Sequence, residues 1–350
     1  MKLSQFKFQL PDELIARFPE HDLDESRMMI LHRKTGEIEH KQFKDILNYF
    51  NEDDVFVLNN SKVMPARLYA CKEKTGANIT VFLRRELNEQ LKLWDVSVDP
   101  ARKIRIGNKL FFGSDNSIVA EVIDNTTSRG RTLRFLYDDD HEEFKKSIYN
   151  LGEAPIPDYL NRPSDESDLE NFQCDFAEIP GATTCPASGL HFSRIIRKRM
   201  EIKGIKEAFI TLHCGQSNFA STDVEDLSKH KMDSEEMFIN EECCSIVNKG
   251  RVEGRKILAV GTTVQRALET ACDTRGQIKP FEGWTNKFIF PPYKFGVANC
   301  MLANFYMPES TLLMLVAAFG GYEYTMEAYK EAVKKGYQFG VYGDAMLIMD

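Results

Sequence analysis

The sequence predicts an α/β domain, formed by both ends of the chain, into which an all-β domain is inserted. Two observations carry this prediction. Between residues 67 and 151 the pattern is β throughout, with short alternating or apolar runs separated by turn clusters such as KTGAN and NTTSRG. Residues 152–350 instead alternate strand-like and helix-like segments, which is typical of a mostly parallel sheet covered by helices. We therefore expect residues 1–66 and 152–350 to form one discontinuous domain and residues 67–151 to form the other.

The first half of the chain supplies mostly strands. Residues 1–66 contain a short helix around Phe43–Phe50 and an apolar strand at Val55–Leu58. In the insertion, several short strands at close spacing predict a small antiparallel barrel or a sandwich. These strands are Leu68–Lys72, Ile79–Leu83, Leu91–Val98, Lys109–Phe112, Ile118–Ile123 and Thr132–Tyr137.

The second half begins with a proline-rich, acidic connector, EAPIPDYLNRPSDESD, and continues as repeated strand–loop–helix units. Three strands are each followed by a polar loop (HCG, GTT and YMPEST), and the last two loops lead into helices. The strands are Ala208–Leu212, Lys256–Val260 and Asn299–Phe305, and the helices are Val264–Cys272, Leu312–Phe319 and a final one at Met326–Lys335.

The composition narrows the class of protein. A net charge of −8 argues against a protein that coats nucleic acid or anionic membrane nonspecifically, although a local basic patch can still hold RNA. The N-terminus has no apolar signal core, and the longest apolar run, Leu312–Phe319, is too short to span a bilayer. Eight cysteines without CxxC spacing predict free thiols in a cytoplasmic protein. We find no metal-binding or standard nucleotide-binding motif, and we expect no metal.

Polar residues gather in the loops that follow the predicted strands. In α/β folds, ligands bind at the carboxyl ends of strands, where the loops lead into helix N-termini. Loops far apart in the sequence would therefore bring hydroxyls and imidazoles together at one ligand site. The residues concerned are Ser188, His191, His213, Thr262, Thr263, Tyr306, Glu309, Ser310 and Thr311.

The stretch CPASGLHFS, just ahead of the basic run Arg194–Lys203, carries the clearest candidate. Small residues such as Ser188 and Gly189 let a ligand approach the backbone, and a following helix N-terminus offers free N–H groups to an anion. His191 would bind the ligand or transfer a proton. The alternative is that the residues are small for tight packing and that His191 is a hydrogen-bonded core residue.

Other titratable residues have competing interpretations. His213 is preferred as a ligand-site residue, with Cys214 as packing, because adjacent strand residues point to opposite faces. His230 and Glu235 form a candidate acid–base pair, against a helix N-cap at Asp233 or Ser234. Asp344 is a turn residue or a buried carboxylate. Thr262 and Thr263 are also expected as a turn and N-cap, and Arg266 with Glu269 as a solvated pair one helical turn apart.

Basic residues cluster in the insertion and on one predicted helix. Most such clusters are solvated faces, but small barrels often hold nucleic acids. The clusters are Arg102, Lys103 and Arg105, then Arg129, Arg131 and Arg134, and the run Arg194–Arg199.

Taken together, the motifs resemble the S-adenosylmethionine:tRNA ribosyltransferase-isomerase family of queuosine biosynthesis, over essentially the whole chain. The matching stretches, in order, are DESRMMIL, VLNNSKVMPARL, EAPIPDYLNRP, GLHF, ITLHCG, KHKMDSE, AVGTTVQRALE, GWTNKFIFPPY, NFYMPESTLLMLVAAF and YGDAM. The resemblance implies an α/β barrel-like domain with an inserted β-barrel. It also implies transfer of the ribosyl part of S-adenosylmethionine to 7-aminomethyl-7-deazaguanine at the tRNA wobble position, with loss of adenine and methionine and without a metal.

That reaction requires a base for a proton next to the sulfonium and a proton for the leaving adenine, and histidine suits both tasks near neutral pH. We expect His191 and His213 to be catalytic, with Glu235 behind them. The residues expected to bind S-adenosylmethionine or tRNA are Arg67, Ser188, Gly189, Thr262, Thr263, Ser310, Thr311 and Asp344.

The chain departs from the family pattern inside its motifs, which predicts a divergent member. The pattern has aspartate at Asn60, threonine at Ala187, leucine and glycine at Gln216 and Ser217, histidine at Tyr306 and arginine at Gln338. Two alternatives to the family reaction therefore stay open: a paralogue that binds RNA or nucleotide without turnover, and an enzyme that uses an adenosyl compound on another acceptor.

Overall fold

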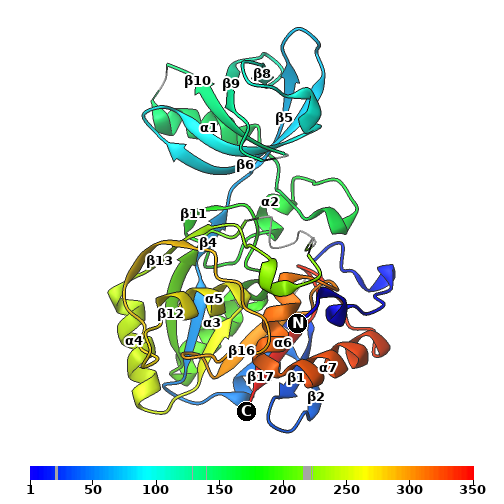
Figure 1. Ribbon diagram of the computed structural model, residues 1–350. Coiled ribbons are helices and arrows are strands. Elements are labelled where there is room, and N and C mark those ends of the chain that lie inside the picture. Colours follow the sequence, from blue (N-terminus) through cyan, green and yellow to red (C-terminus); the bar gives the residue numbers. More distant parts are fainter. Residues whose placement is uncertain (20–22, 128, 139, 216–221, 223) are drawn as a thin grey trace. The chain divides into compact units, whose positions relative to one another are not determined.

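A computed structural model describes residues 1–19, 23–127, 129–138, 140–215, 222 and 224–350 (Figure 1). The chain forms two compact units. The α/β unit contains Met1–Lys62, Pro157–Arg162 and Gln173–Asp350, and the barrel unit contains Val63–Ile156 and Pro163–Phe172. The predicted insertion, residues 67–151, falls inside the first segment of the barrel unit. The predicted fold class, an α/β domain with an inserted β-barrel, is confirmed.

A nine-stranded mixed sheet organises the α/β unit. Its four neighbouring strands β12, β3, β14 and β16 run parallel, β17 is antiparallel to β16 and parallel to β1, and β2, β13 and β15 pair antiparallel towards the edges. In spatial order the strands are β15 (Phe281–Thr285), β13 (Glu235–Ile239), β12 (Lys206–Leu212), β3 (Val55–Asn59), β14 (Ile257–Val260), β16 (Cys300–Asn304), β17 (Ala345–Met349), β1 (Arg27–His32) and β2 (Ile38–Gln42).

The central strands are buried on both faces because helices cover them. Every residue of β3, β14, β16 and β17 is buried, which explains their continuous apolar sequence. Helix α5 packs on β3, β12, β14 and β16, and α6 packs against α5, α7 and β17. The helices are α3 (Arg194–Lys203), α4 (Glu241–Val252), α5 (Thr262–Ala271), α6 (Thr311–Gly320) and α7 (Tyr322–Lys334).

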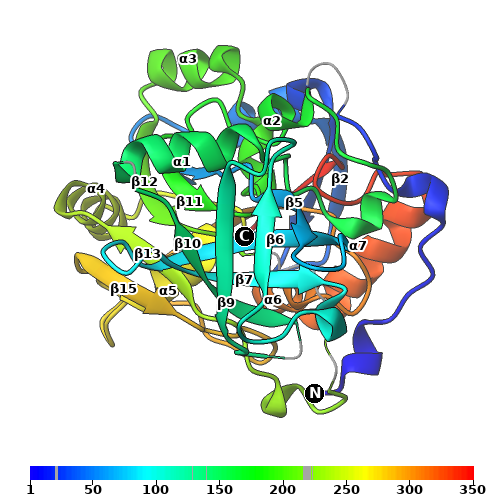
Figure 2. The same ribbon diagram turned by 90° about the horizontal axis from the view of Figure 1, so that it is seen from above.

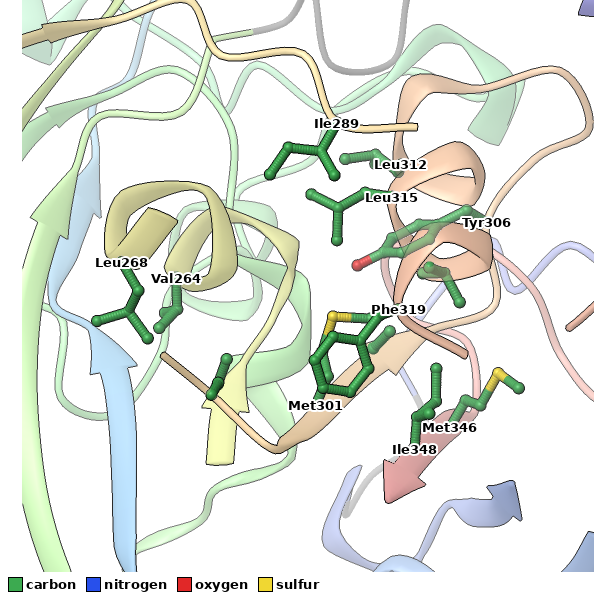
Figure 3. Packing of buried hydrophobic residues seen from close by; sticks show 14 of the residues in the cluster. Val264, Leu268, Ile289, Met301, Tyr306, Leu312, Leu315, Phe319, Met346 and Ile348 are labelled. Atoms are coloured by element: carbon green, nitrogen blue, oxygen red, sulfur yellow. The ribbon is translucent and has the colours of Figure 1, made fainter. Parts of the chain in front are cut away.

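The main core lies between these helices and the sheet. Figure 3 shows Val264 of α5, Met301 of β16, Leu315 and Phe319 of α6 and Ile348 of β17 converging in one apolar cluster. Helix α6 has almost no exposed side chain, so it is apolar around its whole circumference rather than along one stripe.

The barrel unit has its own core inside a closed antiparallel barrel, which decides between the barrel and sandwich predictions. Buried and less buried residues alternate along its strands, as expected when one face of each strand points inward. Helix α1 (His141–Asn150) lies beside the barrel and adds Phe144 and Ile148 to the core (Figures 1 and 2). In spatial order the strands are β10 (Gly130–Leu136), β7 (Leu93–Asp99), β6 (Asn78–Asn88), β5 (Arg67–Lys72), β8 (Lys109–Phe112) and β9 (Ile118–Asp124).

Short elements complete the chain, and one prediction about them is wrong. Asp233 and Ser234 do not cap a helix, because the next element is strand β13. The helix predicted around Phe43–Phe50 is a 3-10 helix, η4 (Phe43–Tyr49). The remaining elements are η1 (Leu3–Phe6), η2 (Asp12–Leu14), η3 (Leu23–Glu25), η5 (Ala101–Lys103), η6 (Asp158–Leu160), η7 (Ala187–His191), η9 (Leu227–Lys229), α2 (Asp168–Asn171), β4 (Ser61–Val63) and β11 (Ile179–Ala182). Within the described ranges, no helix has the length and apolar character needed to cross a membrane.

Ile348→Ala is expected to lower the free energy of unfolding by about 2–5 kcal/mol, because it leaves a cavity in this core. Urea unfolding of the purified protein measures the effect. Ile202→Ala on α3 is the matched control, since Ile202 is 77% exposed and its truncation should change stability by less than about 0.5 kcal/mol. Equal effects of the two substitutions would contradict the assignment of the core.

Candidate active site

His213 is the first residue after β12, and one of its ring nitrogens is anchored. Nδ1 lies 2.7 Å from the hydroxyl oxygen of Ser61, and the His213 backbone N–H donates to the Glu236 carbonyl at 2.9 Å. The ring is half-buried, and desolvation lowers the pKa of His213 to about 4, so the imidazole is neutral near pH 7. Nε2 has no hydrogen-bonding partner among the described residues.

Asn59, at the end of β3, ties His213 and Ser61 to the sheet. Its side chain pairs with Leu212 as a strand backbone would: Oδ1 accepts from the Leu212 N–H at 3.0 Å, and Nδ2 donates to the Leu212 carbonyl at 2.9 Å. The same Oδ1 accepts from the Ser61 backbone N–H at 3.1 Å, and Nδ2 also lies 3.5 Å from the Thr263 hydroxyl. Two predicted site residues, His213 and Thr263, are thereby brought to one place.

Asn60 has a physical reason to differ from aspartate. Its Oδ1 accepts from the Thr211 hydroxyl at 2.7 Å, which either residue type could do. Its Nδ2 donates to a carboxylate oxygen of Glu178 at 3.4 Å. An ionised aspartate has no donor and would repel Glu178. The amide therefore suits its neighbour in this chain.

His191 lies inside the core of the α/β unit and is fully buried. Its Nδ1 donates to the Leu23 carbonyl at 2.9 Å and lies 3.0 Å from the Ser26 hydroxyl, while the ring stacks on Phe43 with centroids 5.0 Å apart. Burial lowers the pKa of His191, and the hydrogen bond to the Leu23 carbonyl opposes that shift. The Nδ1 side of the ring is hydrogen-bonded, as the core interpretation predicts, whereas the buried Nε2 has no hydrogen-bonding partner among the described residues.

The loop before His191 is also packed. Residues Ala187–His191 form the 3-10 helix η7, and α3 begins only after Ser193, whose hydroxyl caps it by accepting from the Ile196 N–H. A side chain on Gly189 would meet the Cys174 sulfur at 2.7 Å, so glycine is required there for packing. The loop therefore does not lead straight into the α3 N-terminus, as the anion-site prediction assumed.

Tyr306 connects two of the predicted loops. Burial raises the pKa of its phenol, while the neighbouring Thr262 and Ser188 side chains oppose the rise. The buried Ser188 hydroxyl has no hydrogen-bonding partner among the described residues. Ser188 is itself buried and lies next to Gly261, where an added Cβ would be 3.6 Å from the Ser188 Cβ. Ser188, Thr262 and Tyr306 thus form a second polar group inside the unit.

Ser310 and Asp344 have structural partners, whereas the buried Thr311 hydroxyl has no hydrogen-bonding partner among the described residues. Ser310 caps α6 by accepting from the Leu313 N–H at 3.2 Å, and Thr311 opens that helix with its side chain buried. Asp344 is a buried carboxylate rather than an exposed turn residue. Its oxygens accept from the backbone N–H groups of Arg27 and Gln338, each at 2.8 Å.

A cleft of about 580 Å³ opens beside the His191 region, within the range of small-molecule sites. Ser26, which contacts His191, and Asp344 both line it. The lining residues between Asp12 and Phe18 belong to no motif recognised in the sequence. Ser26 and Tyr342, by contrast, lie in the matching stretches DESRMMIL and YGDAM. The lining residues are Asp12, Glu13, Ile15, Ala16, Arg17, Phe18, Leu23, Ser26, Gln338, Tyr342 and Asp344.

Glu235 is held in a buried ion pair. Its carboxylate lies 2.5 Å from the Arg266 guanidinium and accepts from the Gly215 N–H at 2.6 Å, and both charged side chains are less than 5% exposed. The predicted solvated pair of Arg266 and Glu269 is wrong, because Glu269 is also buried and accepts instead from the Gly296 N–H at 3.0 Å. The spacing of Arg266 and Glu269 in the sequence does not reveal that the face of α5 carrying both side chains is buried.

Arg67 belongs to the barrel unit, where it opens β5. Its guanidinium lies over the Phe82 ring at 5.0 Å and donates to the Ile156 carbonyl at 3.3 Å. Its backbone pairs with Glu153.

Gln216 and Ser217, two of the departures from the family pattern, lie outside the described residues. Among the described ones, no group of three or more His, Cys, Asp or Glu side chains is placed to hold a metal ion.

The basic clusters of the barrel unit separate into buried and exposed members. Arg131 is buried and donates to the carbonyls of Ala101, Ile104, Thr127 and Gly130. Arg134 pairs with Glu121 at 2.7 Å. Exposed residues without an ion-pair partner in the described ranges are Arg102, Lys103, Arg105 and Arg129.

Comparisons with known proteins agree on one family. The family model described as queuosine biosynthesis protein matches residues 3–348. Relatives named S-adenosylmethionine:tRNA ribosyltransferase-isomerase from Phocaeicola vulgatus and Bacteroides fragilis are 65% and 67% identical, each over 100% of both chains. A crystal structure of S-adenosylmethionine tRNA ribosyltransferase from Thermotoga maritima is 34% identical, covers 99% of this chain and 100% of its own, and has a TM-score of 0.56.

These identities do not single the chain out as divergent, so the expectation of a divergent member is not supported. They run over the full length, and the relative from Flavobacterium psychrophilum, with the same name, is still 58% identical over 100% of both chains. Together with the α/β unit and the closed barrel, they lead to one conclusion: the chain belongs to the queuosine biosynthesis protein family.

Proposed function

We propose that the protein is an S-adenosylmethionine:tRNA ribosyltransferase-isomerase acting in the cytoplasm. It transfers and isomerises the ribosyl part of S-adenosylmethionine onto 7-aminomethyl-7-deazaguanine at the tRNA wobble position. The products are epoxyqueuosine-tRNA, adenine and methionine, and no metal takes part. The observation that carries this proposal is full-length identity of 64–67% to relatives that bear this enzyme name.

The proposed proton-transfer residues are His191 and His213, with Glu235 behind them, and their surroundings suggest different tasks. His213 is half-buried and its Nε2 has no partner in the part of the chain that the structure describes, so it is the imidazole proposed to touch the substrate. His191 is enclosed and holds Leu23 and Ser26 at the wall of the cleft. Glu235 acts through its hydrogen bond to Gly215, two residues after His213.

S-adenosylmethionine is proposed to bind along the polar loops and the cleft of the α/β unit. The volume of the cleft suits a nucleoside-sized ligand, and Asp344 contributes negative charge to a wall that would face a sulfonium cation. The proposed binding residues of this unit are Ser188, Gly189, Thr262, Thr263, Ser310, Thr311 and Asp344.

The barrel unit is proposed to contact the tRNA backbone around the anticodon. The exposed Arg102, Lys103 and Arg105 have no ion-pair partner in the described ranges, so their charges are available to phosphates. The buried Arg131 fixes the segment that contains these three residues, because it donates hydrogen bonds to the Ala101 and Ile104 carbonyls. Arg67 is a further proposed substrate-binding residue of this unit.

Purified protein is expected to release adenine from S-adenosylmethionine only when tRNA carrying 7-aminomethyl-7-deazaguanine is present. His213→Ala should lower this rate by at least about 100-fold, as for loss of a group that assists proton transfer. Chromatographic quantitation of adenine measures it. His32→Ala is the control, because His32 pairs with Glu39 on a different strand. Full activity of the His213 variant would remove this residue from the mechanism, and release without tRNA would favour a different acceptor.

Glu235→Gln is expected to lower the free energy of unfolding by about 3–5 kcal/mol, because Arg266 would stay buried without its carboxylate. Urea unfolding measures the loss, and Glu235→Gln/Arg266→Met should recover part of it. Lys198→Ala, which breaks the exposed pair with Glu201, serves as the control and should cost less than about 1 kcal/mol. Unchanged stability with lost adenine release would instead indicate a direct catalytic role for Glu235.

Arg102→Glu/Arg105→Glu is expected to weaken tRNA binding and to flatten its salt dependence. The slope of log affinity against log salt should fall by roughly 0.7–0.9 for each phosphate that is no longer neutralised by the protein. Filter binding measures this slope at salt concentrations from about 0.05 to about 0.2 M, where protein–nucleic acid affinity changes strongly. Lys330→Glu/Lys334→Glu on α7 is the control, because it changes the net charge by the same amount at a different place in the chain. Equal weakening by both double variants would show only a general effect of net charge.

A further inference from the structure

The hydroxyl of Ser61 has a single hydrogen-bonding partner in the part of the chain that the structure describes. Ser61 is fully buried, its backbone N–H is taken by Asn59, and its Oγ lies 2.7 Å from Nδ1 of His213. A buried hydroxyl proton without an acceptor costs about 1–3 kcal/mol. Nδ1 is the acceptor within reach.

The direction of this hydrogen bond determines the tautomer of the neutral imidazole. If Ser61 donates to Nδ1, the ring proton must reside on Nε2, because a neutral imidazole carries one N–H and one lone pair. Nε2 is the nitrogen that is not engaged by a described residue. The group turned to a ligand would then be an N–H donor and not a lone pair.

Gly181 fixes the plane of the same ring. A Cβ built on Gly181, whose φ is +153°, would lie 2.6 Å from both Cε1 and Nε2 of His213 and 2.7 Å from Cδ2. No real Cβ approaches a ring so closely, so any side chain at 181 would displace the imidazole. The backbone of β11 therefore forms one wall of the His213 seat.

The position of Ser61 is itself set by the sheet rather than by a mobile loop. Asn59 accepts from the Ser61 N–H with the same oxygen that pairs with Leu212, the residue before His213. Both ends of the Ser61–His213 hydrogen bond are thus attached to neighbouring parallel strands, β3 and β12.

We infer that Ser61 and Gly181 are positioning residues that present His213 to the substrate as a neutral hydrogen-bond donor through Nε2–H. This inference rests on the proposed function and sharpens it. An Nε2 that carries its proton cannot remove one from the substrate, but it stabilises negative charge that develops on a ring nitrogen of the departing purine. His213 accordingly assists loss of adenine, and the base for the proton beside the sulfonium is another group.

Long-range ¹H–¹⁵N NMR of protein with labelled histidine tests the tautomer without any turnover. The His213 signals are assigned by their loss in His213→Ala. The expected result is a protonated Nε2 and an unprotonated Nδ1 at pH 7, with the ring staying neutral as the pH falls towards about 4. A protonated Nδ1 in the wild-type protein would overturn the inference.

Variants then link the tautomer to the reaction. Ser61→Ala should give a mixture of tautomers and lower kcat/KM for adenine release by up to about tenfold, while Ser61→Thr should retain both properties of the wild type. Gly181→Ala should displace the ring and cost about 100-fold. Thr211→Val removes another buried hydroxyl of β12 and controls for stability.

Unchanged tautomer and rate in Ser61→Ala would overturn the inference. A wild-type protein that releases no adenine would refute the proposed function, and the NMR result would still decide the tautomer.

Discussion

The parallel strands at the centre of the α/β unit are buried on both faces, so polar groups at their carboxyl ends have to find partners inside the protein. Side chains supply them. The Asn59 amide pairs with Leu212 as a strand would, and the Asn304 amide donates to three carbonyls in the segment 340–343. Asp344 accepts two backbone N–H groups in the same way. Without these side chains, each strand end would leave unsatisfied groups that cost about 1–3 kcal/mol apiece.

This constraint also builds the candidate active site. The residues that satisfy strand ends are the ones that place His213 and shape the cleft, because a loop held by its backbone holds its side chains as well. Glu235 illustrates the point, since its buried pair with Arg266 leaves a second carboxylate oxygen for the Gly215 N–H. A site assembled in this way is organised before any ligand binds, which lowers the reorganisation that the reaction would otherwise require.

The barrel unit satisfies its strands in a different way, by closing into a barrel. Its strands close on themselves and enclose their own apolar core, so no strand edge remains to be covered. Arg131 carries its charge inside this unit, where its partners among the described residues are backbone carbonyls. Because the loop is held from within, Arg102 and Arg105 are not needed for its conformation and remain available for a charged partner.

Local pattern was enough for the fold class and the family. Strand and helix periodicity separates the all-β insertion from the α/β segments, and the order of the motifs identifies the family, because both properties reside in neighbouring residues. The sequence also marked His213 correctly as the end of a strand. It did not reveal that His191 is enclosed by Leu23 and Ser26, that Arg266 pairs with Glu235, or that Asp12–Phe18 line a cleft. Those facts depend on residues far apart in the sequence, such as His191 and Leu23 at a separation of 168 positions, which only the folded chain brings together.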